Sequence, residues 1–153
     1  MMTRYELFCS VISSIHRCIQ KIERDEMIKY GSKGIFAQYL AALKSHPEGL
    51  TSAQLSDLCD KDKAAVSRAL ADMSACGLVT RTNRGDRVYR ARLTLTEEGL
   101  RAADYVAERA CAAVEAGGRG LSDEDRQTLY AALELIAGNL AVVSRDGIPD
   151  SEK

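Results

Sequence analysis

The chain has 153 residues, of which 46% are hydrophobic and 28% are charged, and its formal net charge is −1. These values describe one globular domain that can bury a core of its own, and they exclude disordered, collagen-like and low-complexity chains. The N-terminus has no apolar region of the signal-peptide kind, and no stretch reaches the about 18 apolar residues that a spanning helix needs, so a cytoplasmic protein is expected.

The five cysteines form neither a disulfide framework nor a zinc site. They lie at positions 9, 18, 59, 76 and 111, without a Cys-x-x-Cys pair. An odd number of scattered cysteines is typical of a reducing compartment, where most are expected to be small buried hydrophobic side chains. The sequence therefore predicts no metal and no cofactor.

The small net charge hides an uneven distribution. Residues 1–50 hold seven basic and five acidic side chains, residues 51–95 hold eight and five, and residues 96–153 hold six and twelve. Within 77–95 a single acid, Asp86, accompanies five arginines, at positions 81, 84, 87, 90 and 92. This pattern predicts an anion-binding element in the middle of a nearly neutral protein.

Two amphipathic helices are predicted in the first part of the chain. In residues 3–28 apolar side chains recur every three or four positions, with Leu7, Val11 and Ile15 among them. The glycine-rich stretch 30–34 ends this helix, and a second helix is predicted over about 35–45. The first apolar stripe is broad for a helix that covers a small domain alone, so a partner chain is expected to bury it.

Two shorter helices are predicted next, over 51–59 and about 62–76. Thr51 and Gln54 have the spacing of a capping box, which opens the first of them. In the second, Val66, Leu70 and Met73 form a buried face, and the glycine at position 77 is placed to end it. Two short helices joined by about three residues are typical of a helix-turn-helix.

A β-hairpin and two further helices complete the predicted order. Residues 78–82 and 87–95 read as strands around a turn at 83–86, and a hairpin directly after a helix-turn-helix is a wing. A helix capped by the Thr96 hydroxyl is then expected to run to about 116, and another, opened by Ser122 with Asp125, to about 143. The apolar stripe of the last helix is formed by Leu129, Leu133, Ile136, Leu140 and Val143.

The order and spacing of five short motifs resemble the MarR family of winged helix-turn-helix transcription regulators. The motifs are at residues 52–59, 62–68, 77–79, 86–87 and 93–99. The resemblance implies a mainly α fold with a small β-hairpin wing, in a single domain of residues 1–153. Within it, residues 32–95 would form the DNA-binding winged helix-turn-helix, and residues 1–30 and 96–145 would be dimerisation helices.

The resemblance implies a homodimer that binds a pseudo-palindromic double-stranded DNA operator as a repressor, and not an enzyme. The helix at 62–76 would enter the major groove, and the wing would reach the minor groove and the phosphates. The expected DNA-binding residues are Thr51, Ser52, Lys63, Ala64, Ser67, Arg68, Arg84, Arg87 and Arg90. They combine donors for phosphate and base edges with a small side chain that fits against a thymine methyl group.

The resemblance also implies a small aromatic or phenolic effector, and it leaves two alternatives open. Side chains expected to contribute to an effector pocket are Tyr5, His16, Met27, Tyr30, Phe36 and Tyr39, although residues at such helical spacing often belong to a plain core. One alternative is a thiol-based redox-sensing regulator that uses Cys9 or Cys18. The other is a winged-helix protein-interaction module without DNA binding.

Overall fold

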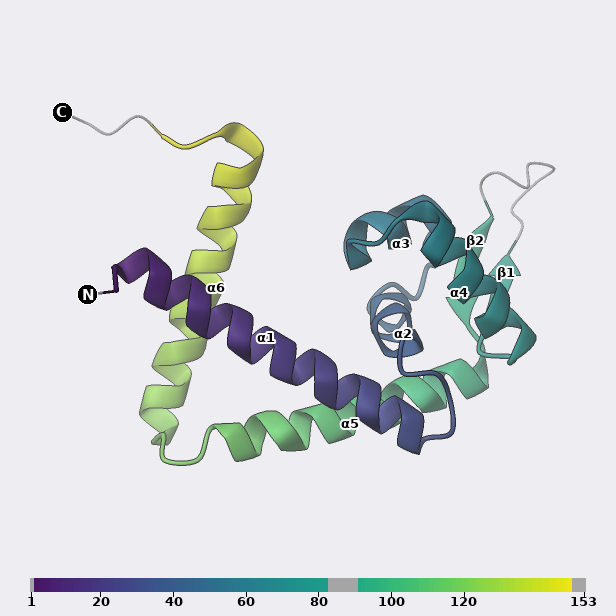
Figure 1. Ribbon diagram of the computed structural model, residues 1–153, viewed down its shortest axis with the longest axis horizontal. Helices are drawn as coiled ribbons and strands as arrows, with labels where there is room; N and C mark the ends of the chain where they lie inside the picture. The colour runs from purple at the N-terminus through teal and green to yellow at the C-terminus, as the bar shows by residue number, and fades with distance from the viewer. Residues whose placement is uncertain (1, 83–90, 150–153) are drawn as a thin grey trace. The chain divides into compact units, whose positions relative to one another are not determined.

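The computed structural model describes residues 2–82 and 91–149, and residues 83–90 lie outside this description. Its elements follow in the order α1 (Arg4–Lys29), α2 (Phe36–Lys44), α3 (Ser52–Cys59), α4 (Lys63–Ala75), β1 (Val79–Thr82), β2 (Arg92–Leu95), α5 (Glu97–Gly117) and α6 (Asp123–Asp146) (Figure 1). The chain divides into two compact units, Met1–Val114 and Glu115–Lys153. The mainly helical fold with one small hairpin confirms the predicted fold class.

Side-chain caps explain where several helices begin. In α3 the hydroxyl of Thr51 accepts from the Gln54 amide at 3.2 Å, and the Gln54 side chain accepts from the Thr51 amide at 2.9 Å. The predicted capping box is therefore confirmed. Ser122 caps α6 in the predicted way, and α1 begins with a further capping box, between Thr3 and Glu6, that the sequence analysis did not anticipate.

The C-terminus of α4 follows the predicted glycine stop. Gly77 has a φ of +71°, and the Leu78 amide donates to the Met73 carbonyl at 2.9 Å. This is the Schellman arrangement, in which a left-handed residue lets the chain return over the last turn. The chain continues directly into β1. This strand pairs with β2 in antiparallel orientation, from Val79↔Leu95 to Thr82↔Arg92.

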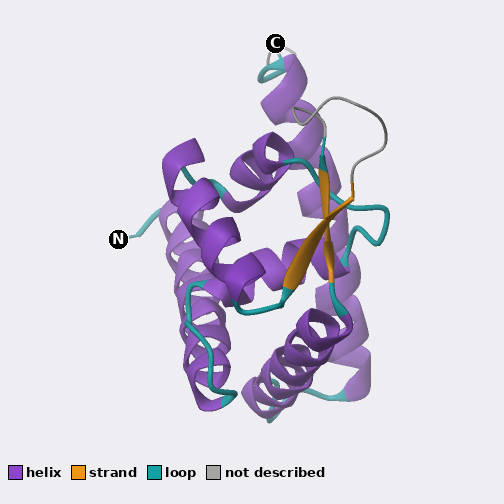
Figure 2. Cartoon of the chain, turned by 90° about the vertical axis from the view of Figure 1, so that its right-hand side faces the viewer, coloured by secondary structure: helices purple, strands orange, loops and turns teal. Residues whose placement is uncertain are grey.

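The hairpin is tied to the loop before α3 by contacts that the sequence did not predict. Leu50 forms an antiparallel bridge with Leu93, with backbone hydrogen bonds of 3.0 and 2.8 Å. The Arg92 guanidinium donates to the Gly49 carbonyl at 2.8 Å. These bonds hold the base of the hairpin (Figure 2) against the helix-turn-helix.

The core lies in the first unit, between the end of α1, the helices α2, α3 and α4, the strands and the first half of α5. Its largest fully buried side chains include Tyr39, Phe36, Met27, Leu40 and Leu43. The predicted inward face of α4 is confirmed, because Val66, Leu70 and Met73 are all buried. The core stabilises the unit through the removal of this apolar surface from water.

Gly99 is required by the close approach of α5 to the start of β1. A Cβ atom at this position would lie 1.9 Å from the Leu78 carbonyl oxygen. The same crossing is fixed by Thr96, whose hydroxyl donates to the Gly77 carbonyl at 2.6 Å and accepts from the Gly99 amide at 3.0 Å. The predicted N-cap role of Thr96 is therefore confirmed.

A polar cluster joins the C-terminal part of α1 to α5. The buried carboxylate of Glu26 accepts from Lys29 at 2.6 Å and from Arg109 and the Tyr105 hydroxyl at 3.2 and 3.3 Å. The hydrogen bond and charge of Lys29 hold the pKa of Glu26 below its usual value, and Arg109 adds to this. Tyr30 donates to Glu98 at 2.7 Å beside these groups.

Other apolar side chains remain exposed. In α1 they include Leu7, Val11 and Ile15, which are 52%, 46% and 51% exposed. In α6, within the second unit, Leu129 and Leu140 of the predicted stripe are 43% and 52% exposed, and Leu133, Ile136 and Val143 are partly buried. Each predicted stripe therefore has members that remain exposed.

Helix α6 is also the one described helix whose length and hydropathy match those of a membrane span, with none of the matching stretch buried. A single helix of this kind is weak evidence for a membrane protein. Polar residues interrupt it, among them Gln127, Glu134 and Asn139.

The expectation that most cysteines are buried is wrong. Cys18, Cys76 and Cys111 are exposed, and Cys9 and Cys59 are partly exposed. The reason is positional: Cys76 is the C-cap of α4, and Cys18 and Cys111 lie on the solvent side of α1 and α5. Burial raises the pKa of the Cys59 thiol.

Candidate nucleic-acid interface

The turn between α3 and α4 sets the direction of the second helix. Asp60 takes the left-handed conformation, with a φ of +48°. The buried hydroxyl of Ser56 donates to the Lys61 carbonyl at 2.5 Å, and the Lys61 amide donates to the Ser56 carbonyl at 3.1 Å. The Asp62 carboxylate then accepts from the Ala65 amide at 2.8 Å and caps α4.

The outward face of α4 carries the side chains that the sequence assigned to DNA. Lys63, Ala64, Ser67 and Arg68 are all exposed, on the side opposite the buried Val66. Within residues 2–82 and 91–149, the side chains of these three polar residues make no hydrogen bond or ion pair. Their donors are therefore available to an external acceptor.

The same face extends one turn beyond the predicted residues. Ala71 is exposed and follows Ala64 and Ser67 at helical spacing. Only small side chains stand at these three positions, so the helix backbone is able to approach a surface closely there. The spacing alone was sufficient to find Ala71, but an alanine carries no chemical signal that singles it out.

The start of α3 lies in the same helix-turn-helix. Ser52 is exposed, whereas Thr51 is partly buried and its hydroxyl already accepts from the Gln54 amide. The amide groups in the first turn of a helix attract anions. Ser52 is therefore better placed than Thr51 to contact a phosphate.

The described arginines of the hairpin fall into two kinds. Arg81 in β1 is exposed, whereas the Arg92 guanidinium in β2 donates a hydrogen bond to the Gly49 carbonyl. Arg92 thus has a structural role as well as a charge. The three wing residues of the DNA-binding prediction, Arg84, Arg87 and Arg90, lie outside the described residues.

The six predicted effector residues do not gather around one space. Met27, Phe36 and Tyr39 belong to the buried core, and Tyr30 packs against Tyr105 with ring centroids 5.2 Å apart. Tyr5 and His16 are exposed on α1. Cavities of about 210 and 340 Å³ lie elsewhere on the first unit, and none of the six residues lines either cavity.

The redox candidates, Cys9 and Cys18, both lie on α1. Cys9 is partly exposed and Cys18 is exposed. Because they are nine positions apart on one helix, they cannot pair with each other within the chain. A redox role for either thiol stays a prediction.

The arrangement of α3, α4 and the hairpin defines a class of protein, the winged helix-turn-helix proteins. Residues 33–87 match the sequence profile of the MarR family. No curated protein sequence matches the chain.

The structure also resembles solved structures over most of its length. A MarR-family transcriptional regulator from Silicibacter pomeroyi is 24% identical, with 94% of this chain and 90% of that chain covered and a TM-score of 0.68. A MarR regulator from Methanosarcina mazei Go1 is 24% identical, with 92% and 94% covered and a TM-score of 0.76. A putative MarR-family regulator from Listeria monocytogenes, solved with a 26mer DNA, is 19% identical, with 94% and 97% covered and a TM-score of 0.72.

The match over residues 33–87 confirms that the winged helix-turn-helix segment resembles the MarR family, as its sequence motifs indicated. MarR-family proteins are transcription regulators rather than enzymes.

Proposed function

We propose that this protein is a cytoplasmic repressor that binds a pseudo-palindromic DNA operator as a homodimer. The observation that carries the proposal is the outward face of α4. It presents Lys63, Ser67 and Arg68 without intramolecular partners among the described residues, directly after a capped helix-turn-helix turn. A helix of this kind fits the major groove of B-DNA, where such side chains reach base edges and phosphates.

The roles within the interface follow from the chemistry of each side chain. The Arg68 guanidinium binds guanine or a phosphate through two parallel hydrogen bonds. Lys63 and Ser67 donate to phosphate or base edges, and Ala64 contacts a thymine methyl group. Ser52, with the first turn of α3, fixes the register on the DNA backbone.

The homodimer is supported by the uncovered apolar faces. Leu7, Val11 and Ile15 on α1 are each about half exposed, which is costly for a helix that stays in water. A second copy that covers this stripe places two α4 helices for two half-sites, with centres about 34–36 Å apart. Occupation of such a site excludes RNA polymerase from an overlapping promoter.

A ligand response belongs to the same proposal. A small molecule that binds better to one arrangement of the two α4 helices shifts the population toward it and changes DNA affinity. The family resemblance suggests a small aromatic or phenolic molecule for this role.

Fluorescence anisotropy with a labelled duplex from the promoter of its own gene tests the DNA-binding assignment. Arg68→Ala is expected to weaken binding about tenfold or more, since a bidentate contact is worth about 1–3 kcal/mol. Arg87→Ala is expected to weaken it as well. The matched control is Arg101→Ala on α5, because that guanidinium pairs with Glu97 and Glu98.

Salt provides a second readout in the same assay. Binding by the parent protein is expected to fall steeply between about 50 and 200 mM salt, because phosphate contacts release counterions. If Arg68→Ala and Arg87→Ala both bind like the parent protein, the assigned surface is wrong. If the parent protein shows no salt-dependent retention of DNA, a protein-interaction module is the better explanation.

A further inference from the structure

One ion pair links α4 to the loop that precedes α2. The Lys33 ammonium donates to the Asp72 carboxylate, with an Nζ–Oδ2 distance of 2.6 Å. Asp72 is the one acidic residue in the sequence of α4, and it lies four positions after Arg68. Both side chains of the pair are more than half exposed, so the pair adds little to stability. Its consequence is instead for the charges that α4 presents.

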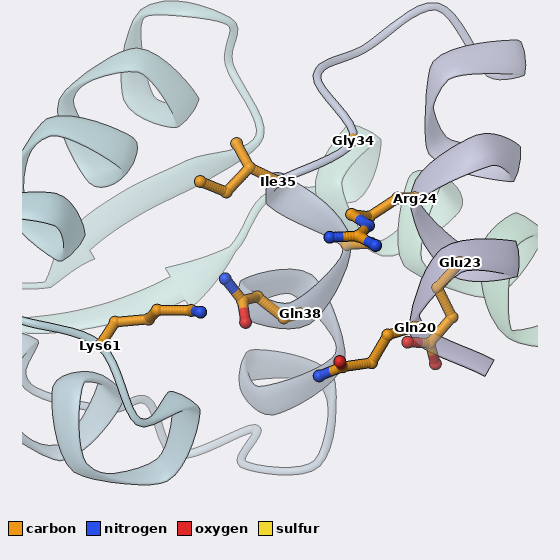
Figure 3. A pocket seen from close by; sticks show the side chains of 8 residues that line it. Gln20, Glu23, Arg24, Gly34, Ile35, Gln38 and Lys61 are labelled. Carbon is orange, nitrogen blue, oxygen red and sulfur yellow. The ribbon is translucent and has the colours of Figure 1, made fainter. Parts of the chain in front are cut away.

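The position of Lys33 is fixed by the loop around it. The Phe36 amide donates to the Lys33 carbonyl at 2.9 Å, at the start of α2. Gly34, the next residue, packs against α1 near Arg24 (Figure 3), where a Cβ atom would lie 3.0 Å from the Arg24 carbonyl oxygen. The Lys33 ammonium also lies 5.8 Å from the centre of the buried Phe36 ring, whose face attracts a cation. The loop therefore holds a positive charge beside α4.

Arg68 and Asp72 have the spacing of an ion pair within a helix. Side chains four positions apart meet on the helix surface, and both of these are exposed. Among the described residues, however, Arg68 has no ion pair, and the carboxylate is occupied by Lys33. The acid follows the base here, which is the less favourable order for such a pair. The lysine from the loop thus takes the partner that Arg68 would otherwise find on its own helix.

Loss of the Lys33 charge would affect an approaching anion in two ways. The uncovered Asp72 carboxylate would compete for the Arg68 guanidinium, and its negative charge would repel phosphate groups near the outward face of α4. Both effects depend on the carboxylate. Removal of the two charges together leaves Arg68 as free as it is in the parent protein.

We propose that Lys33 is a positioning residue that keeps Arg68 free for DNA by occupying Asp72. The inference rests on the proposed DNA-binding function of α4, and it adds to that function a residue outside α3 and α4. Lys33 acts through Asp72 and not through a contact of its own with DNA. Its effect on DNA affinity therefore disappears when the carboxylate is removed.

NMR spectroscopy of the full chain without DNA tests the competition for Arg68. The rate of rotation about the Nε–Cζ bond of Arg68 reports whether a carboxylate holds the guanidinium. We expect this rotation to be about twofold slower in Lys33→Met than in the parent protein, because an ion pair at this spacing changes an equilibrium by about that factor. The double variant Lys33→Met/Asp72→Asn is expected to show the rate of the parent protein.

Fluorescence anisotropy with the promoter duplex tests the consequence for DNA. Lys33→Met is expected to weaken binding about two- to fivefold, since Arg68 is partly occupied and the carboxylate repels phosphates. The double variant Lys33→Met/Asp72→Asn is expected to recover the affinity of the parent protein. The matched control is Lys21→Met, which removes the lysine of another exposed ion pair, with Asp25 on α1. It changes the net charge by the same amount and is expected to bind like the parent protein.

Three results would overturn the proposal. The first is equal rotation of Arg68 in the parent protein and Lys33→Met, and the second is unchanged DNA affinity in Lys33→Met. The third is a double variant that binds as weakly as Lys33→Met, which would show that Lys33 contacts DNA itself. A parent protein that binds no duplex would contradict the proposed function instead, and slowed rotation in Lys33→Met would still support the competition for Arg68.

Discussion

Two regions of the chain differ in how far their apolar side chains are buried. The part from α2 to the first half of α5 buries most of its apolar side chains in a core of its own, with Phe36, Leu70 and Leu93 almost completely covered. The N-terminal half of α1 leaves a comparable stripe exposed, with Ile15 at 51%. The first region thus covers its apolar surface within the chain, whereas the second leaves apolar surface that the proposed homodimer would cover.

The largest effect is expected from Gly99→Ala, which disturbs the packing of the region from α2 to the first half of α5. The new Cβ would lie 1.9 Å from the Leu78 carbonyl oxygen, so α5 and the start of β1 must separate. We expect a loss of about 3 kcal/mol in the free energy of unfolding, measured by urea denaturation.

The control for Gly99→Ala is Gly117→Ala in the same helix, where a Cβ meets nothing within 4 Å. It is expected to change stability by less than about 0.5 kcal/mol. Equal stabilities of the two variants would contradict the close packing assigned to α5 and β1.

The next effect is expected from Ile15→Lys, which changes the exposed apolar stripe of α1 that the proposed homodimer would cover. A charge in the middle of the α1 stripe is expected to weaken self-association about tenfold or more, because each copy loses a buried apolar side chain. Sedimentation velocity measures the dissociation, and circular dichroism is expected to show unchanged helicity.

Ser13→Lys adds the same charge to α1 at a polar position and serves as the control. Its self-association is expected to match that of the parent protein. A parent protein that is already monomeric at high concentration would show that the exposed stripe has another partner.

The smallest effect is expected at the polar cluster between α1 and α5. The pKa of Glu26 is lowered in the folded chain. The ionised carboxylate therefore stabilises the fold at pH values above 4.5, the ordinary pKa of a glutamate. This contribution is lost as the pH falls through and below that value. Glu26→Gln is therefore expected to lower the Tm at pH 7, with a difference from the parent protein that shrinks toward pH 3.

Glu108→Gln on the exposed side of α5 is the control for Glu26→Gln. Thermal melts at pH 7, 5 and 3 provide the comparison. A difference that stays constant over this range would show that Glu26 acts through packing and not through its charge.

The sequence predicted the parts of the fold that local chemistry decides. The capping box at Thr51, the glycine stop at Gly77 and the buried face of α4 each depend on residues within a few positions of one another. The bridge between Leu50 and Leu93 did not follow from the pattern, because it joins distant segments through backbone groups alone.

The same distinction applies to the candidate site. The outward face of α4 was predictable because helical periodicity places Lys63, Ser67 and Arg68 opposite the apolar side chains. The cavity of about 210 Å³, which Arg24 of α1 and Lys61 of the α3–α4 turn help to line, was not predictable, because these segments are distant in the sequence. Of the six predicted effector residues, Met27, Phe36 and Tyr39 lie in the buried core, and an effector role for the set stays a prediction.

Hydroxyl-radical footprinting of the promoter duplex tests the central claim most directly. The account predicts two protected patches, related by symmetry, with centres about one helical turn or 34–36 Å apart. Both patches are expected to weaken together in Arg68→Ala. A single protected patch, or protection unchanged in Arg68→Ala, would contradict the account.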